Sequence, residues 1–321
     1  MTDAGSGTTV LDDIVVAMLL PPRDPRGHKG TNGTLLAICG SLDYAGAALL
    51  VGVAAARAGA GLVCLAVPAS LQMLFAGRVP ELVTIGLPER DPGVVDPVES
   101  LRVIASRHPT AVVAGSGLRA SPAVIELVSL LVAEGSLDDG VPLVCDAEAL
   151  NSLALSPGWW QRVARPCVLT PHPGEFRRLR PSVDGDLSSD DELRGRAAAA
   201  AAREWRSTVV LKGARTVIAT PDGRLAQVPF ENAALATAGT GDVLAGTIGG
   251  LLAQGLEPWA AASAGAYLHG VAAERISERL GDAGLLASDL PWEIALARRR
   301  LGEVRDLQAK RGAFGFAQRQ S

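Results

Sequence analysis

Short apolar runs alternate with longer alanine-rich stretches along most of this chain of 321 residues. The runs are typical of strands buried on both faces, and the stretches between them favour helices. This alternation predicts one α/β domain with a mostly parallel central sheet and helices on both faces. The turn Thr-Pro-Asp-Gly at 220–223 predicts an antiparallel pair among the last three strands. We expect strands at residues 34–39, 61–67, 82–86, 111–114, 142–145, 167–170, 208–211, 217–219 and 225–228, and helices at residues 47–58, 97–106, 122–133, 190–206, 243–253 and 258–280.

The composition favours a folded protein with a sizeable core, because 48% of the residues are hydrophobic and 20% are charged. The formal net charge is -4 and the basic residues are scattered, so we expect no nucleic-acid partner. No apolar stretch reaches the ~20 residues of a membrane span. Residues 1–10 lack the basic segment followed by an apolar segment that is typical of a signal peptide. We therefore expect a cytoplasmic protein with no membrane partner. The four cysteines stand in apolar runs, and we expect no zinc or redox-metal site.

The turn Ala-Gly-Thr-Gly-Asp at 238–242 is the strongest chemical signal in the chain. It precedes a helical run, and successive amides at a helix start form a pocket for a phosphate or a developing oxyanion. We expect Gly239, Thr240 and Gly241 to form an anion hole, with Asp242 on its rim as a base for a hydroxyl. The alternative is an ordinary glycine turn in which Asp242 only favours the helix start.

Three further polar segments follow predicted strands, where an open α/β sheet binds its ligands. Lys212 precedes a glycine and suits a phosphate, although a lone lysine is more often solvated, and the chain has no P-loop motif. His172 lies between two prolines and, with Glu175, suits a polar ring or amide; alternatively, Glu175 only opens the next helix. Asp146 suits a sugar hydroxyl or a hydrated Mg²⁺, or caps a helix.

Six segments of the chain occur in an order that resembles one family. The chain is similar, over about residues 23–290, to the ADP/ATP-dependent NAD(P)H-hydrate dehydratases, which have a ribokinase-like fold. The segments are His28-Lys29-Gly30, Ala45-Gly46-Ala47, Asp146-Ala147-x-Ala149-Leu150-Asn151, Thr170-Pro171-His172-Pro173-Gly174-Glu175, Leu211-Lys212-Gly213-Ala214-x-Thr216 and Thr237-Ala238-Gly239-Thr240-Gly241-Asp242-Val243-Leu244.

The resemblance implies one site at the carboxyl edge of the sheet. It implies that Asp242 is the catalytic base, and that the nucleotide is held by Lys212, Gly213, Ala214, Arg215, Thr216 and Gly241. The hydrated nicotinamide nucleotide would face Ala45, Gly117, His172 and Asp242, with Asp146, Asn151 and Glu175 in support.

The reaction that the resemblance implies starts as a kinase half-step. The ring hydroxyl of hydrated NADHX or NADPHX attacks the terminal phosphate of ADP, and that phosphate then leaves, which yields NAD(P)H, AMP and phosphate. ATP is the other possible co-substrate. Mg²⁺ would screen the phosphate charges and bind through the nucleotide, with no direct protein ligand.

The resemblance also divides the chain, into an N-terminal segment at 1–22, the ribokinase-like domain at 23–293 and a tail at 294–321. The tail is locally basic from 298 to 319, and we expect it to be solvated. We expect a homo-oligomer that works with a separate NAD(P)HX epimerase.

Two departures from the family pattern stand out. The family shows Gly-Pro-Gly-Leu-Gly where this chain has Gly-Ser-Gly-Leu-Arg at 115–119, so Arg119 either alters cofactor preference or points to solvent. The family's Gly-Asn-x-Gly-Met-Ala stands here as Glu-Asn-Ala-Ala-Leu-Ala at 231–236, which concerns the geometry of that loop.

Three other functions are compatible with parts of the sequence. A small-molecule kinase of the same superfamily would use the same anion hole and base. An NAD-dependent oxidoreductase would use the Gly-x-Gly-x-x-Ala run at 115–120, but the acid expected ~20 residues later is missing. A nucleotide sensor without turnover would not need Asp242.

Overall fold

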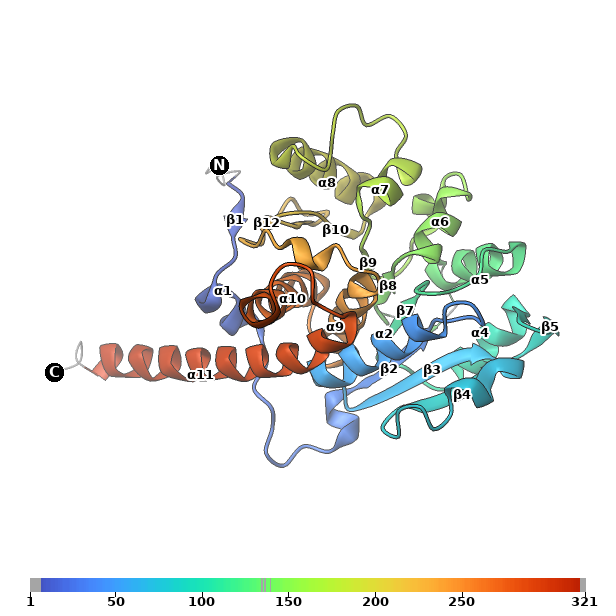
Figure 1. Ribbon diagram of the computed structural model, residues 1–321, viewed down its shortest axis with the longest axis horizontal. Coiled ribbons are helices and arrows are strands. Elements are labelled where there is room, and N and C mark those ends of the chain that lie inside the picture. The colour runs from blue at the N-terminus through green and yellow to red at the C-terminus, as the bar shows by residue number, and fades with distance from the viewer. Residues whose placement is uncertain (1–6, 134, 136, 139, 318–321) are drawn as a thin grey trace.

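A ten-stranded sheet runs through the residues that the computed structural model describes, which are 7–133, 135, 137–138 and 140–317 (Figure 1). The strands lie in the order β1-β12-β11-β10-β9-β8-β7-β2-β3-β4. Neighbours are parallel except β10 with β11 and β11 with β12, so the mostly parallel sheet and the antiparallel pair are confirmed. The strands are β1 (Thr9–Val10), β2 (Thr34–Ile38), β3 (Leu62–Pro68), β4 (Val83–Leu87), β7 (Ala111–Ala114), β8 (Leu143–Cys145), β9 (Cys167–Leu169), β10 (Thr208–Leu211), β11 (Val217–Ala219) and β12 (Leu225–Gln227); β5 (Glu89–Asp91) and β6 (Val94–Val95) form a separate hairpin.

Two layers of helices cover the sheet, as expected, and each layer closes its own hydrophobic cluster. One cluster includes residues of α1 (Asp13–Leu19), α2 (Ala45–Ala58), α3 (Gln72–Phe75), α9 (Thr240–Ala253), α10 (Pro258–Leu280) and α11 (Leu290–Ala317). The other includes residues of α4 (Pro97–Ala105), α5 (Pro122–Val132), α6 (Glu148–Ala154), α7 (Pro173–Leu179) and α8 (Asp191–Trp205).

Glycines fix the position of α9, the helix that follows the predicted anion hole. A Cβ at Gly246 would lie 2.3 Å from the carbonyl oxygen of Val51 in α2, and a Cβ at Gly249 would lie 2.3 Å from Cγ2 of Val113 in β7. Since only glycine allows both approaches, α9 packs directly against α2 and the sheet. Its first turn is thereby held rigidly.

The C-terminal segment differs from the solvated tail that we expected at 294–321. Helix α11 begins at Leu290, and Ile294, Ala297 and Leu301 are at most 1% exposed. These apolar residues recur every three or four positions among the arginines, which gives the helix one face that packs against α10 and α2. The described part of the segment therefore belongs to the domain, and residues 318–321 lie outside the described residues.

The N-terminal segment at 1–22 is likewise integrated where it is described. Strand β1 pairs with β12, and α1 packs against α11 with Val16 and Ala17 buried. Residues 1–6 lie outside the described part of the chain. Among the described helices, none combines the length and the apolar character of a membrane span.

Candidate functional site

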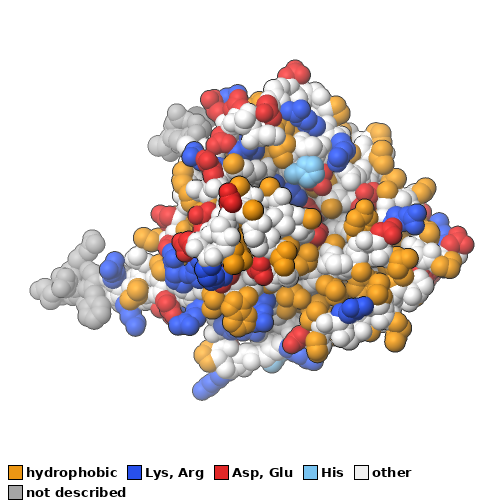
Figure 2. Space-filling model, in the orientation of Figure 1, with side chains coloured by type: hydrophobic (Ala, Val, Ile, Leu, Met, Phe, Trp, Pro, Cys, Tyr) orange, Lys and Arg blue, Asp and Glu red, His pale blue; other side chains and the backbone are white. Residues whose placement is uncertain are grey.

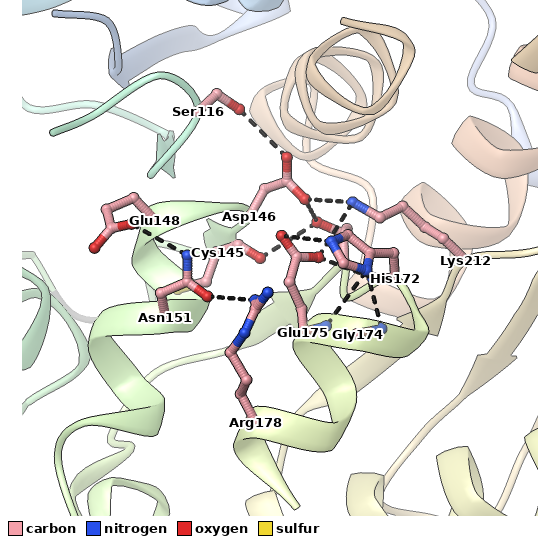
Figure 3. A network of polar contacts seen from close by, with 11 residues as sticks. Ser116, Cys145, Asp146, Glu148, Asn151, His172, Gly174, Glu175, Arg178 and Lys212 are labelled. Atoms are coloured by element: carbon pink, nitrogen blue, oxygen red, sulfur yellow. Dashed lines mark hydrogen bonds and ion pairs between the residues drawn. The ribbon is translucent and has the colours of Figure 1, made fainter. Parts of the chain in front are cut away.

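Four neighbouring parallel strands each lead into a polar side chain at the same edge of the sheet. Ser116 lies just beyond β7, Asp146 follows β8, Thr170 follows β9 and Lys212 follows β10. The carboxyl ends of parallel strands meet at one edge, and Figure 3 shows Ser116, Asp146 and Lys212 converging there. Thr170 joins them through its hydrogen bond to Asp146. Asp242, in the first turn of α9, is close enough to interact electrostatically with the same group.

Asp146 is the centre of this polar network and is only 2% exposed. Its Oδ1 accepts hydrogen bonds from Thr170 Oγ1 at 2.7 Å and Lys212 Nζ at 2.8 Å, and its Oδ2 accepts one from Ser116 Oγ at 3.4 Å. Helix α6 has no side-chain cap, so Asp146 is not a capping residue. Its carboxylate instead holds the lysine ammonium in place.

Lys212 is a partly buried, paired cation rather than a solvated lysine. Its Nζ also lies 3.7 Å from Glu175 Oε2, and the side chain is 19% exposed. Burial opposes the charged form, but attraction to Asp146, Glu175 and Asp242 outweighs it and raises the pKa of Lys212. A Cβ at Gly241 would lie 3.4 Å from Nζ, so the ammonium reaches the first turn of α9.

Asp242 has the electrostatics of a base that works near neutral pH. Burial, and then repulsion from Asp146, raise its pKa to about 6, while a hydrogen bond from Ser116 and attraction to Lys212 act in the opposite direction. A carboxylate with such a pKa can accept a proton more readily than an exposed aspartate, which titrates near 3.9.

The three residues of the glycine turn before Asp242 have different structural roles. Gly239 precedes the helix with φ +89, a conformation that favours glycine. Thr240 Oγ1 donates to the carbonyl oxygens of Leu235 and Thr237 at 2.8 and 2.9 Å, so this hydroxyl anchors the turn. The amides of Gly241 and Asp242 belong to the first helical turn, which has no intrahelical acceptors. Both amides are therefore available as donors to an anion.

A cavity of about 540 Å³ opens beside this turn. Five of the six residues predicted to hold the nucleotide line it: Lys212, Gly213, Ala214, Thr216 and Gly241. Its other walls are mainly apolar and include Val228, Phe230, Leu244 and Ala266. A cavity with one cationic end and apolar walls suits a flat ring that carries phosphate groups.

Arg215, the sixth of those residues, is not among the residues that line the cavity. Its guanidinium pairs with Glu231 and Asp191 instead. Arg194 fixes the loop that contains Ala214 and Arg215. It is fully buried and donates hydrogen bonds to the carbonyl oxygens of Leu187 and Ala214.

His269 lines the cavity, although its place in an alanine-rich helix predicted only a core or interface histidine. Its Nε2 lies 2.9 Å from the carbonyl oxygen of Thr240, and burial lowers its pKa to about 4, so the ring is neutral at pH 7. Phe230 and Asn232 also line the cavity without having been predicted. Ser116 was missed too, although its place between two glycines after a strand was a usable signal.

His172 and Glu175 form a reciprocal cap at the start of α7. His172 Nδ1 accepts hydrogen bonds from the amides of Gly174 and Glu175 at 3.0 and 3.3 Å, and Glu175 Oε2 accepts one from the amide of His172 at 2.8 Å. Because Nδ1 is an acceptor, the ring proton is on Nε2. Burial is the main cause that lowers the pKa of His172, and its side chain is still 50% exposed. The ring therefore caps the helix through Nδ1, while half of the side chain remains exposed.

Two of the remaining predicted residues lie side by side at the start of α2. Ala45 is the first residue of that helix, and a Cβ at Gly117 would lie 2.7 Å from the carbonyl oxygen of Tyr44. Gly117 has φ +68, so both conformation and space require glycine. Arg119 is exposed.

Asn151, which was predicted to support the site, lies within α6. Its side chain donates to Glu148 and accepts a hydrogen bond from Arg178 of α7 at 2.8 Å (Figure 3). Asn151 thus ties α6 to α7.

The donor set fits Mg²⁺ that is held through a nucleotide. In the described part of the chain, no group of three or more His, Cys, Asp or Glu side chains is arranged to hold a metal. The acid best placed for it, Asp146, already accepts hydrogen bonds from Lys212, Thr170 and Ser116. Phosphate oxygens in the cavity would therefore have to supply most of the ligands.

Sequence comparisons identify a family to which the chain is similar. Residues 35–295 match the family described as NAD(P)H-hydrate dehydratase. A bifunctional NAD(P)H-hydrate repair enzyme of Moorella thermoacetica is 43% identical over 84% of this chain and 50% of its own length, so the chain spans about half the length of such relatives. An ADP-dependent (S)-NAD(P)H-hydrate dehydratase of Neisseria meningitidis is 39% identical over 85% of this chain and 86% of its own length.

The solved structures agree as well. The ADP/ATP-dependent NAD(P)H-hydrate dehydratase of Bacillus subtilis, co-crystallised with ATP and Mg²⁺, is 31% identical and superposes with a TM-score of 0.78 over 92% of this chain and 99% of its own. A ribokinase-like superfamily protein of Enterococcus faecalis is only 22% identical but superposes with a TM-score of 0.75 over 94% of this chain and 99% of its own, so the expected ribokinase-like fold is confirmed. With the family match covering most of its length, this chain belongs to the NAD(P)H-hydrate dehydratase family.

Proposed function

We propose that this chain catalyses the ADP-dependent dehydration of hydrated NADH or NADPH. The observation that carries the proposal is the position of Asp242, whose pKa is raised to about 6: it directly follows Gly241, which lines the cavity together with Lys212. A base, a cation and free amides at one point are the groups that phosphoryl transfer from a nucleotide to a hydroxyl requires.

In the proposed reaction Asp242 accepts the proton of the ring hydroxyl as its oxygen attacks the terminal phosphorus of ADP. The bond from that phosphorus to the bridging oxygen breaks, and AMP is released. Lys212 and the amides of Gly241 and Asp242 stabilise the negative charge on the phosphoryl oxygens. The ring carbon–oxygen bond then breaks, phosphate leaves with both bonding electrons, and loss of a ring proton gives NAD(P)H.

The two substrates would approach the catalytic base from opposite sides. The apolar walls around Phe230 suit the adenine ring of ADP. The region around Ala45, Gly117 and the exposed edge of His172 would then receive the hydrated nicotinamide. When bound with the nucleotide, Mg²⁺ would screen the charges of the phosphate oxygens.

The direct test is to incubate the protein with hydrated NADH and ADP, or ATP, and to follow the absorbance of reduced nicotinamide together with phosphate release. We expect both signals to rise in equal amounts. A stable phosphorylated product without phosphate release would instead indicate a kinase. A matched control is Asp282→Asn, which changes an exposed acid in the loop after α10 and should leave the rate unchanged.

The remaining expectations concern partners. The name of the Moorella relative pairs hydrate repair with a second activity, and this supports an NAD(P)HX epimerase as the partner enzyme. A homo-oligomeric state and a cytoplasmic location stay predictions. Light scattering of the purified chain tests the oligomeric state.

A further inference from the structure

A second cavity, of about 390 Å³, lies between the loop after α1, the end of α2 and the middle of α11. None of its eleven lining residues is acidic, and five are arginines: Arg23, Arg57, Arg298, Arg299 and Arg305. We therefore call it the arginine groove. This concentration of positive charge occurs in a chain whose net charge is -4. Figure 2 shows basic side chains grouped along α11, in blue.

Three of these arginines have no carboxylate partner among the described residues. Arg23 donates to the carbonyl oxygen of Gly59 at 3.2 Å, and Arg57 lies over the ring of Trp292 at 4.7 Å. Arg298 donates to Gln254 Oε1 at 2.7 Å. By contrast, the other two form ion pairs on their own helix, Arg299 with Glu303 and Arg305 with Asp306.

Arg298 is the buried centre of the groove. Its Nη1 is buried and has no hydrogen-bond partner among the described residues. The same atom lies only 2.1 Å from where a Cβ at Gly59 would be, and Gly59 has φ +107, so the backbone there leaves room for the guanidinium. Burial, followed by repulsion from Arg23 and Arg305, lowers the pKa of Arg298 to about 10.

Such an arrangement is unfavourable without a counter-ion. A buried N–H group without an acceptor and several cations close together both destabilise the folded chain. The guanidinium group presents several donors in one plane, a geometry that matches the oxygens of a phosphate. An anion in the groove would accept the free hydrogen bond of Arg298 and reduce the repulsion among its neighbours.

We propose that the arginine groove is a second anion-binding site, which takes the phosphate groups of a phosphorylated small molecule. The site is separate from the nucleotide cavity, since the two share no lining residue. Two elements join them. Helix α2 begins at Ala45 beside the catalytic region and ends at the groove, and Gln254, which directly follows α9, holds Arg298.

The test is a calorimetric titration of the full chain with inorganic pyrophosphate at low salt. We expect the double variant Arg23→Gln/Arg57→Gln to bind pyrophosphate about a hundredfold more weakly, because it removes two charge-assisted contacts and each is worth about a factor of ten. The matched control, Arg196→Gln/Arg203→Gln on α8, removes the same charge from an exposed surface and should bind as the unmodified chain does. Equal affinities in all three proteins, or equal losses in both variants, would overturn the proposal.

A second variant tests the role of the buried arginine, Arg298. Arg298→Gln removes the unpaired cation, so we expect its thermal midpoint without ligand to be no lower than that of the unmodified chain, and the upward shift caused by pyrophosphate to be smaller. An undiminished shift in Arg298→Gln would contradict a role for Arg298. Neither measurement uses the hydrate or ADP, so the outcome does not depend on the proposed dehydratase activity.

Discussion

At the scale of single residues, the site depends on how three carboxylates share one lysine. Asp146 and Glu175 are almost fully buried and lie near Lys212, whereas Asp242 is only partly buried and feels both the lysine and the repulsion of Asp146. The acids therefore have different roles: Asp146 positions the cation, Glu175 caps a helix, and Asp242 is left with a raised pKa.

For Asp242→Asn we predict a loss of kcat of at least about 10²-fold, because the amide cannot accept the proton. The unmodified rate should fall as the pH drops through about 6, where Asp242 becomes protonated. Steady-state kinetics between pH 5 and 8 measure both effects. Near-full kcat in a folded variant would contradict the role of base.

The same substitution should stabilise the fold at neutral pH. The pKa of Asp242 is raised on folding, so its favourable contribution is complete below about pH 4 and is lost as the pH rises through about 6. Asn has no such charge, so we expect a gain of about 1–3 kcal/mol in unfolding free energy at pH 7.5 that vanishes near pH 4. Urea unfolding at the two pH values tests this, and a loss of stability at pH 7.5 would mean that the carboxylate mainly supports the helix start.

His172 combines a structural role with the proposed binding role, and two substitutions separate them. His172→Asn keeps an acceptor for the amides of Gly174 and Glu175, whereas His172→Ala removes it and should cost about 1 kcal/mol of stability. We expect both variants to have a higher KM for the hydrate and an unchanged affinity for ADP. An unchanged KM in His172→Asn would mean that His172 caps the helix and does not bind the hydrate.

At the scale of elements, α11 is a helix whose many arginines obscure, in the sequence, the spacing of its apolar residues. Its residues Ile294, Ala297 and Leu301 complete the core under α2 and α10. The helix also supplies Arg300, which pairs with Asp13 of α1. The element thus joins both ends of the chain to the domain.

We predict that a chain that ends at residue 293 will not fold stably. Burying one Ile or Leu side chain contributes about 1.5–3 kcal/mol, and whole domains are stable by only about 5–15 kcal/mol. A chain that ends at residue 311 keeps the buried face and serves as the control. Circular dichroism and urea unfolding of both chains give the answer, and a native-like midpoint for the shorter chain would contradict the role of α11.

At the scale of the whole molecule, the site exists because one sheet brings distant segments to one edge. Residues 116, 146, 170 and 212 are separated by 24 to 66 positions where they bond to one another. The loop after β12 and the start of α9 then close the cavity. Binding there should therefore stabilise the domain as one unit.

Calorimetry with Mg²⁺ and ADP tests this cooperativity. At an ADP concentration of about 100 Kd, we expect a single unfolding transition that gains about 2.7 kcal/mol of stability. The Lys212→Ala variant should show a smaller shift, since it loses a charge-assisted contact. Two separate transitions, only one of them shifted by ADP, would contradict a single cooperative domain.

The sequence by itself determined the alternating elements and the order of the motifs. Strands β7, β10 and β11 have the expected bounds, because a run that is apolar on both faces can be satisfied only inside a sheet. The strand-end position of Asp146 and Lys212 was also predictable, since it follows from where each apolar run stops. The fold of α11 was not, because local basic charge concealed the spacing of its buried residues.

Only the tertiary structure decided which polar groups pair and which face remains open. Sequence separation carries no information on whether Lys212 meets Asp146, on the exclusion of Arg215 from the cavity, or on the contact of His269 with the carbonyl oxygen of Thr240. The raised pKa of Asp242 likewise depends on desolvation and on charges brought in by other strands. Both effects vary steeply with distance and burial, so they are properties of the packed molecule and not of any local pattern.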